Sequence, residues 1–221
     1  MRQMLDRRTF LTVMGVGSLT FLLSPRLTRA EEKPPIPGAL LLAKIETPPF
    51  RDAVVLLYKR GRSGSAGLIV NKPNHLSLAR IMARMNAPFR DRATYRRYAR
   101  LEVLYGGPVG RDRLLSLIHT PPGRWARSWN LGVVGVTQAP DLLRGLGAGT
   151  AGIKQVIACL GVAGWGPGQL EAEIAAGHWQ VVYPEPAALP ELLFETPACD
   201  RLEKARHLPE GLPTGIPGRA I

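Results

Sequence analysis

Short runs of apolar residues, each bounded by glycine, proline or polar residues, recur along most of the chain and restrict the folds open to it. They are 38–44, 53–60, 65–73, 103–109, 114–120, 131–137, 154–164 and 178–184. Several of these runs are apolar throughout instead of alternating with polar residues, which is typical of strands covered on both faces. We therefore expect a sheet with other elements packed on each side.

Helical signals lie between these runs. Ser77 can begin a helix over LARIMARM, Thr137 can begin a second, and residues 169–176 form a third that Gly177 ends. Residues 86–100 form an arginine-rich insertion that we expect to be partly helical. Strands interspersed with helices predict a single α/β or α+β domain, with a mixed sheet and helices on its faces.

The first 30 residues have the layout of an export signal. Arg7 and Arg8 precede a weakly hydrophobic stretch at 10–23, and a small-residue site ends at Ala30. The stretch is shorter than the about 18–20 residues that span a bilayer comfortably. We interpret it as a twin-arginine signal, so the partner of the leader would be the Tat export machinery and the protein would be periplasmic. A gene start placed too early is the alternative, and the protein would then be cytoplasmic.

The predicted organisation follows from this interpretation. Residues 1–30 are the signal peptide, 31–36 a linker, 37–206 the folded domain and 207–221 a flexible tail rich in proline and glycine. Cys159 and Cys199 are the two cysteines. Export would allow them to pair, whereas the apolar run around Cys159 favours a buried free thiol, and both alternatives stay open.

The segment GVAGWGPGQLEAEIAAGHW, residues 161–179, joins a predicted strand to a predicted helix. Helix N-termini attract anions, but Glu171 lies in the first turn and would repel a phosphate. Glycines also permit tight backbone turns. We therefore favour a structural corner in which Trp165 packs over the turn, with a ligand cleft beside Trp165 as the alternative.

Other motifs do not specify a reaction. GAGTAG at 147–152 precedes a strand, whereas the dinucleotide fingerprint follows one. Residues 61–65 miss the last position of G-x-S-x-G and suit a hairpin loop between two strands. The histidines lack metal-binding spacing, and we expect His119 to be half-buried and structural. We predict no catalytic residues, no metal and no cofactor.

The chain is strongly basic, with a formal net charge of +12. Basic residues of the insertion alternate with Phe89, Tyr95 and Tyr98. The basic members are Arg90, Arg92, Arg96, Arg97 and Arg100. Such a patch binds anionic partners, and for an exported protein we expect an acidic protein or an anionic lipid surface. Nucleic acid binding is an alternative that the export signal disfavours.

Several blocks together resemble the AlgH/YqgE-like family over residues 36–197. They include SAGLIVNKP, LYGGPVGRDRLLSLIHT and, as the most specific part, AGWGPGQLEAEI. The resemblance implies a compact α/β fold with a mixed, strongly bent sheet flanked by helices, and no established enzymatic activity. Some members are labelled transcriptional regulators of exopolysaccharide synthesis. This chain departs from the family at Lys59 and Arg60, where Glu-His is usual, and in its leader, which argues against a regulator of transcription.

Matching positions of the resemblance give candidates for a shared ligand-binding surface. They are Asn71, Pro73, Gly106, Gly107, Pro108, Trp165, Gly166, Pro167, Gly168 and Gln169. Asn71 and Gln169 are the polar members and can hydrogen-bond a ligand. We expect a non-catalytic binding or regulatory protein. The alternatives are an enzyme with a small pocket near Asn71 and the turn at 164–168, and a nucleic-acid-binding regulator. The oligomeric state stays open.

Overall fold

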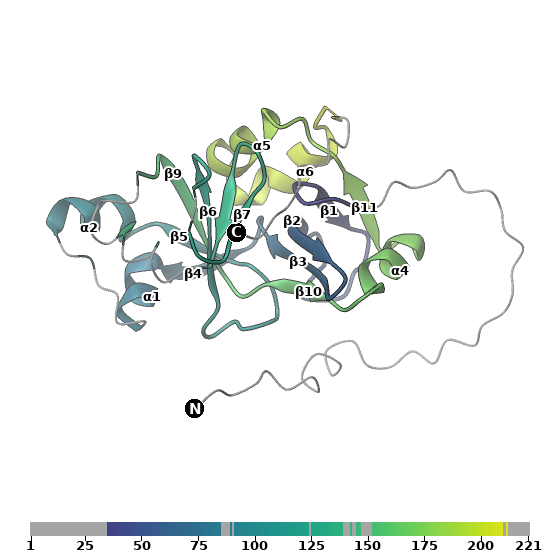
Figure 1. The fold of residues 1–221 in the computed structure, drawn as a ribbon, viewed down its shortest axis with the longest axis horizontal. Coiled ribbons are helices and arrows are strands. Elements are labelled where there is room, and N and C mark those ends of the chain that lie inside the picture. Colours follow the sequence, from purple (N-terminus) through teal and green to yellow (C-terminus); the bar gives the residue numbers. More distant parts are fainter. Residues whose placement is uncertain are drawn as a thin grey trace, which may run out of the picture. The chain divides into compact units, whose positions relative to one another are not determined.

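A computed structural model describes residues 35–84, 89, 91–123, 125–138, 142, 145–146, 152–209 and 211. Residues 34–221 form one compact unit, which Figure 1 shows as a ribbon. This unit combines strands and helices, so the predicted α/β (α+β) class and the single compact domain are confirmed. The leader and its cleavage site lie outside the described residues.

The strands form two sheets, of which one is antiparallel throughout. Its order is β10-β3-β2-β1-β11. The bounds are β1 (Leu40–Ala43), β2 (Val54–Gly61), β3 (Gly64–Ile69), β10 (Ala163–Trp165) and β11 (Trp179–Val182). Strands β2 and β3 form a tight hairpin in which Gly61 faces Gly64, as expected for the loop at 61–65.

The second sheet is mixed, with the order β4-β5-β9-β6-β8-β7. The bounds are β4 (Pro73–Ser77), β5 (Glu102–Tyr105), β6 (Leu115–Thr120), β7 (Ser128–Asn130), β8 (Gly135–Thr137) and β9 (Gln155–Leu160). Strands β5 and β9 are parallel and the other pairs are antiparallel. The apolar run 154–164 therefore contains more than one strand, because it divides into β9 and β10, whereas the run 131–137 holds only β8.

Helices cover the outer faces of both sheets. They are α1 (Leu78–Arg84) and α2 (Arg92–Tyr98) beside the mixed sheet, and α4 (Gln169–Ala175) beside the antiparallel one (Figure 1). Ser77 Oγ accepts a hydrogen bond from the Arg80 amide at 3.4 Å, as expected for the start of α1. Most of the helix expected after Thr137 lies outside the described residues. The described positions of this stretch, 142, 145 and 146, are helical.

The apolar core is divided into three clusters that follow the alternation of the strands. Leu40 and Leu42 face a central cluster that also holds Leu104 and Ile157 of the mixed sheet. Leu41, between them, points to the opposite face and packs in the cluster that contains helix α4. Because both faces of the strands are covered, their sequences are apolar throughout, as the sequence analysis predicted.

A helical C-terminal segment closes the central cluster, and its sequence gave no prediction of structure. It consists of α5 (Ala188–Pro190), a π-helical turn η1 (Glu191–Glu195), a 3₁₀ turn η2 (Ala198–Asp200) and α6 (Arg201–Arg206). Leu189, Leu192 and Leu193 pack into the cluster. The buried Arg201 donates hydrogen bonds to the carbonyls of Val70 and Leu193, which fixes the segment to the end of β3. None of the described helices is both long enough and apolar enough to cross a membrane.

Candidate functional site

The predicted corner between β10 and α4 is a turn at 166–168 that reverses the chain. Gly168 has φ of +73° and precedes the first residue of α4. Gln169 Oε1 accepts a hydrogen bond from the Gly166 amide at 3.0 Å. The turn also lies close to the β2–β3 hairpin, because a Cβ on Gly64 would lie 2.1 Å from the Trp165 carbonyl oxygen. The exposed Pro167 completes the turn.

The carboxylate of Glu173 organises the side chains of this corner. Its Oε2 accepts hydrogen bonds from the indole N–H groups of Trp165, at 2.9 Å, and Trp179, at 2.8 Å. Its Oε1 accepts a third bond from the Gln169 amide at 2.8 Å. One carboxylate on α4 therefore connects β10, the start of α4 and β11.

Aromatic packing completes the corner. Trp165 and Trp179 are each 3% exposed, and their ring centroids lie 5.7 Å apart in an edge-to-face arrangement. Phe50 packs against Trp179 in the same way at 5.5 Å. Trp165 thus packs inside the fold. At the surface nearby, Arg60 pairs with Glu171 at 3.1 Å, so Arg60, at one of the positions that depart from the family pattern, pairs with the first turn of α4.

Glu173 was not selected by the sequence analysis, which named only Glu171 among the acidic residues of this helix. A usable signal was present, because Gln169 and Glu173 are four residues apart and share one helix face. The contacts with the two tryptophans join β10 and β11, which are not neighbours in the sheet. No local pattern reports such contacts.

Asn71 connects the end of β3 to the start of β2. Its Oδ1 accepts a hydrogen bond from the Val54 amide at 2.9 Å, and its Nδ2 donates to the Asp52 carbonyl at 2.7 Å. Both polar atoms of the side chain are thus bonded to the backbone. Pro73 is exposed at the start of β4, opposite Leu104.

Gly106 and Gly107 lie where the chain passes closely between the two sheets. The Gly106 amide donates to Leu160 and its carbonyl accepts from Ile69, which joins the mixed sheet to β3. Gly107 has φ of +149°, and a Cβ there would lie 2.1 Å from the Val162 carbonyl carbon. The half-buried Pro108 follows. Only glycine fits this junction without moving the backbone.

The ten shared-surface candidates therefore form two separate groups, one near each end of β3. Trp165 pairs with Ser65, and Gly106 bonds to Ile69. These two β3 residues are four positions apart, or about 13 Å at the usual rise per residue of a strand. The enzyme alternative placed a pocket near both Asn71 and the turn at 164–168, and the structure places these two regions at opposite ends of the strand.

The arginine-rich insertion contains helix α2. Asp91 caps it by accepting hydrogen bonds from the Ala93 and Thr94 amides, both at 2.9 Å. Thr94 and Tyr98 are buried, so the other face is turned to solvent. That face and the residues next to it carry Arg92, Arg96, Arg97 and Arg100, all exposed. Arg90, the fifth predicted member, lies outside the described residues.

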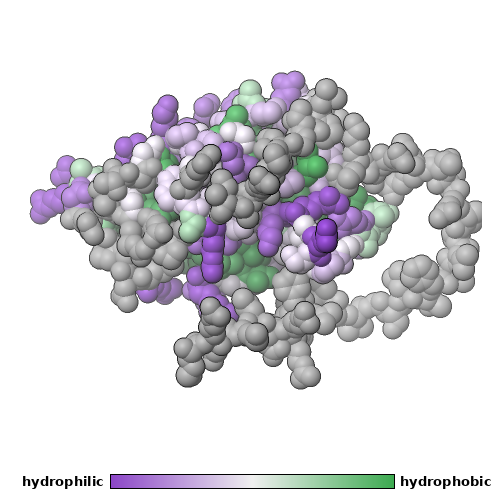
Figure 2. Space-filling view, viewed as in Figure 1, coloured by the Kyte–Doolittle hydropathy of each residue, from purple (hydrophilic) through white to green (hydrophobic). Residues whose placement is uncertain are grey.

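Aromatic residues accompany these arginines. Tyr95 is 53% exposed and packs edge-to-face against Phe89 with centroids 5.8 Å apart. The Arg97 guanidinium carbon lies 5.3 Å from the centre of the Tyr98 ring. Figure 2 shows hydrophilic residues gathered over the α2 end of the compact unit.

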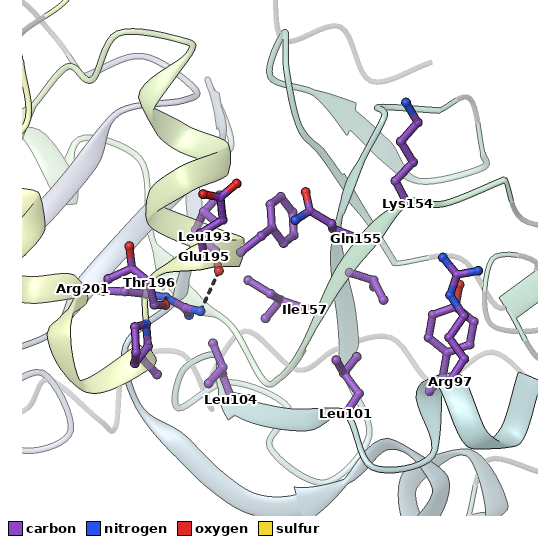
Figure 3. A pocket seen from close by; sticks show the side chains of 15 residues that line it. Arg97, Leu101, Leu104, Lys154, Gln155, Ile157, Leu193, Glu195, Thr196 and Arg201 are labelled. Atoms are coloured by element: carbon purple, nitrogen blue, oxygen red, sulfur yellow. Dashed lines mark hydrogen bonds between the residues drawn. The ribbon is translucent and has the colours of Figure 1, made fainter.

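A cavity of about 530 Å³ is lined by residues of α2, β9 and the C-terminal segment (Figure 3). Arg97, Tyr98 and Leu101 line one side, and residues 193–198 with Arg201 line the other. Arg97 is the only one of the described candidate residues that reaches it. The sequence analysis missed this cavity because its second wall belongs to the unpredicted C-terminal segment.

Two buried polar groups connect strands in the interior. His119 is fully buried, more than the half-burial expected, and burial lowers its pKa from the usual 6.5. Its Nδ1 bonds to the Pro121 carbonyl at 3.0 Å, so Nδ1 carries the proton and Nε2 accepts from the Thr137 hydroxyl at 2.9 Å. Gln138 donates to Tyr58 at 2.9 Å, and burial raises the pKa of Tyr58 to about 12.

The cysteines are both free: Cys159 is buried and Cys199 is exposed. Burial raises the pKa of the Cys159 thiol to about 12, which keeps it protonated. Among the described residues, no group of three or more histidine, cysteine or acidic side chains is arranged to hold a metal ion.

These features define a single-domain α+β protein with two packed sheets, a tryptophan corner closed by an internal carboxylate, and a basic surface helix next to a cavity. The chain belongs to the AlgH-like family, whose model matches residues 40–211.

Relatives and solved structures agree with this assignment. A UPF0301 protein of Thioalkalivibrio sulfidiphilus is 35% identical over 162 residues, covering 73% of this chain and 81% of the relative. One from Idiomarina loihiensis is 33% identical, covering 73% and 83%. The solution structure of AlgH from Pseudomonas aeruginosa matches with a TM-score of 0.63 and 28% identity, over 76% of this chain and 85% of AlgH. Protein DIP2367 from Corynebacterium diphtheriae, at 21% identity and a TM-score of 0.58, covers 81% and 90% and shares the fold.

Proposed function

We propose that this AlgH-like protein is a non-catalytic binding protein, exported in folded form, that docks on an anionic membrane surface through helix α2. The observation that carries the proposal is the outer face of α2, which presents arginines and an exposed tyrosine to solvent. The polar side chains of the tryptophan corner support the non-catalytic part, because they are bonded to one another.

The chemistry of the α2 face favours a lipid surface over other anionic partners. Arginine side chains pair with lipid phosphates, and tyrosine partitions to the level of the headgroups. Tyr95 is the large apolar side chain that is most exposed in the described part of the chain. A basic surface with an aromatic residue at its centre therefore matches both the charge and the polarity gradient of a bilayer surface.

The leader supports a location where such a surface is available. Its arginine pair, short apolar stretch and small-residue site predict delivery of folded protein to the periplasm. There the protein faces the anionic lipids of the inner membrane. Docking would then hold the AlgH-like domain at the membrane after removal of residues 1–30.

Sedimentation with lipid vesicles tests the proposal. The full chain should sediment with vesicles rich in phosphatidylglycerol and stay in solution with phosphatidylcholine vesicles. Each basic residue near an anionic surface contributes about 1 kcal/mol. Replacing Arg92, Arg96 and Arg100 by glutamine should therefore weaken binding by about 3 kcal/mol, roughly a hundredfold.

A matched variant separates the helix from the net charge of the protein. Lys44, Arg62 and Arg113 are exposed basic residues outside α2, and their replacement by glutamine removes the same charge. This variant should bind vesicles almost as the parent does. Equal losses in the two triple variants, or absence of binding to phosphatidylglycerol, would refute docking through α2. Retained binding to an acidic protein in that case would support the other partner expected from the sequence.

A further inference from the structure

The cavity between α2, β9 and the C-terminal segment has the size of a small-molecule site. Its volume of about 530 Å³ lies within the range of known ligand pockets, about 300–1,000 Å³. It lies at the margin of the central apolar cluster, to which Leu104, Ile157 and Leu193 belong. These side chains form the apolar part of a lining that also contains charged and polar residues.

Two cationic side chains line the same side of the cavity. Figure 3 shows Arg97 and Lys154 on the same side of the cavity, with Leu104 and Ile157 between them and Arg201. Both side chains are exposed, and neither forms an ion pair with any residue of the described part of the chain. Stacking on Tyr98 orients the Arg97 guanidinium.

The opposite side of the cavity has a different character. Arg201 lies there with its guanidinium bonded to the carbonyls of Leu193, at 2.6 Å, and Thr196, at 3.1 Å. Its charge is thus used to hold the C-terminal segment. The exposed carboxylate of Glu195 also lines this side. A ligand with anionic groups at both ends would therefore meet like charge at Glu195.

We propose that this cavity binds an amphipathic molecule with one anionic head and an unbranched hydrocarbon chain. The head lies between Arg97 and Lys154, where it forms charge-assisted hydrogen bonds. The chain crosses Leu104 and Ile157 toward Leu193 and displaces water from apolar surface. A carboxylate and a phosphate monoester are the heads that satisfy this chemistry.

Calorimetric titration of the full chain with short amphiphiles tests this site. Decanoate and decyl phosphate should each bind with a stoichiometry of one, and the stronger of the two identifies the preferred head. Decyltrimethylammonium has the same chain length with a cationic head, and we expect it to bind at least tenfold more weakly. Butanoate has the head without the chain and should give no measurable heat. Decanedioate should bind more weakly than decanoate, because its second carboxylate approaches Glu195.

Variants assign the binding to the cavity. Replacing both Arg97 and Lys154 by glutamine should weaken the binding of decanoate at least tenfold. Both positions are exposed, so we expect the double variant to fold normally. Ala198 is half-buried in the lining, so Ala198→Trp should occlude the cavity and reduce binding of every decyl compound. The variant with Arg92→Gln and Arg96→Gln removes the same charge from α2 outside the cavity and should bind decanoate as the parent does.

Several results would overturn the proposal. Binding of many amphiphiles per chain would show detergent-like adsorption. Equal affinity for decanoate and decyltrimethylammonium would show that the two cations take no part. An unchanged affinity in Ala198→Trp would place the ligand elsewhere. These outcomes are independent of the vesicle experiment, in which Arg97 and Lys154 are left in place.

Discussion

The tryptophan corner and helix α2 both combine aromatic and polar side chains. At the corner these side chains point into the fold, whereas on α2 most of them point to solvent. At the corner, two indoles and an amide donate hydrogen bonds to the carboxylate of Glu173, and both tryptophans are buried. On α2, the arginines and Tyr95 face solvent, while the capping Asp91 and the buried Thr94 and Tyr98 hold the helix in place.

The comparison separates polar groups that build the fold from polar groups that are available to a partner. A carboxylate that already accepts three internal hydrogen bonds has little acceptor capacity left for a ligand. Exposed arginines lose little free energy when an anion replaces water as their hydrogen-bond partner. Substitutions of polar residues are therefore expected to change stability at the corner and partner binding on α2.

The largest effect is expected at Glu173. Glu173→Leu leaves two indole N–H groups and the Gln169 amide without their acceptor, and each unsatisfied buried donor costs about 1–3 kcal/mol. Because water reaches part of this half-buried carboxylate, we expect a loss of about 3 kcal/mol in the free energy of unfolding. Urea denaturation followed by tryptophan fluorescence measures it.

Two neighbouring substitutions sharpen this prediction. Glu173→Gln keeps one acceptor oxygen and should lose about half as much stability. Glu171→Gln removes only the partly exposed ion pair with Arg60, which is worth about 1 kcal/mol or less. If Glu171→Gln lowered the free energy of unfolding as much as Glu173→Leu, the internal hydrogen bonds would not explain the stability of the corner.

A pH dependence of intermediate size is expected from His119. Burial lowers its folded pKa below 6.5, so the unfolded chain binds the proton more strongly. Stability is therefore complete above pH 6.5 and decreases as the pH falls from there toward the folded pKa, by up to about 1.4 kcal/mol for each unit of difference. Unfolding measured one unit above and one unit below pH 6.5 should show the loss in the parent and a smaller one in His119→Gln. An equal slope in both proteins would assign the pH dependence to other groups.

The smallest effect on stability is expected on α2. Arg92→Gln with Arg96→Gln changes exposed side chains whose heads lie in water, so the free energy of unfolding should change by about 0.5 kcal/mol or less. The same variant should nevertheless reduce binding to phosphatidylglycerol vesicles. A loss of several kcal/mol in thermal unfolding would show that these arginines support the fold, and the contrast between the two regions would fail.

The fold class was accessible from sequence because burial on both faces leaves apolar runs that need no alternation. The division into two sheets was not, because the run at 154–164 is continuous in composition and changes sheets at Gly161, where φ is +81°. The C-terminal helices were missed for a similar reason. They are short, contain a π-helical turn and are held by Arg201, a buried charge whose partners lie just after β3 and on η1.

The candidate sites show the same limit. Of the glycines in the selected blocks, Gly107 lies at a close backbone approach and Gly168 supplies a positive φ, and the two serve separate ends of β3. Asn71, chosen for its polarity, bonds to the backbone on both sides. The cavity required three segments that are far apart in the chain, and only tertiary structure brings Arg97, Lys154 and Leu193 to one place.

Strand order also constrains when this protein can fold. Leu40, near the start of the domain, faces Val182 across β1 and β11, and β9 inserts between β5 and β6, which precede it. A growing chain on the ribosome therefore cannot close the mixed sheet before residue 160 emerges, nor the antiparallel sheet before residue 182. Until then its apolar strands lack their final partners, and an export route that accepts only finished folds would act on the completed polypeptide.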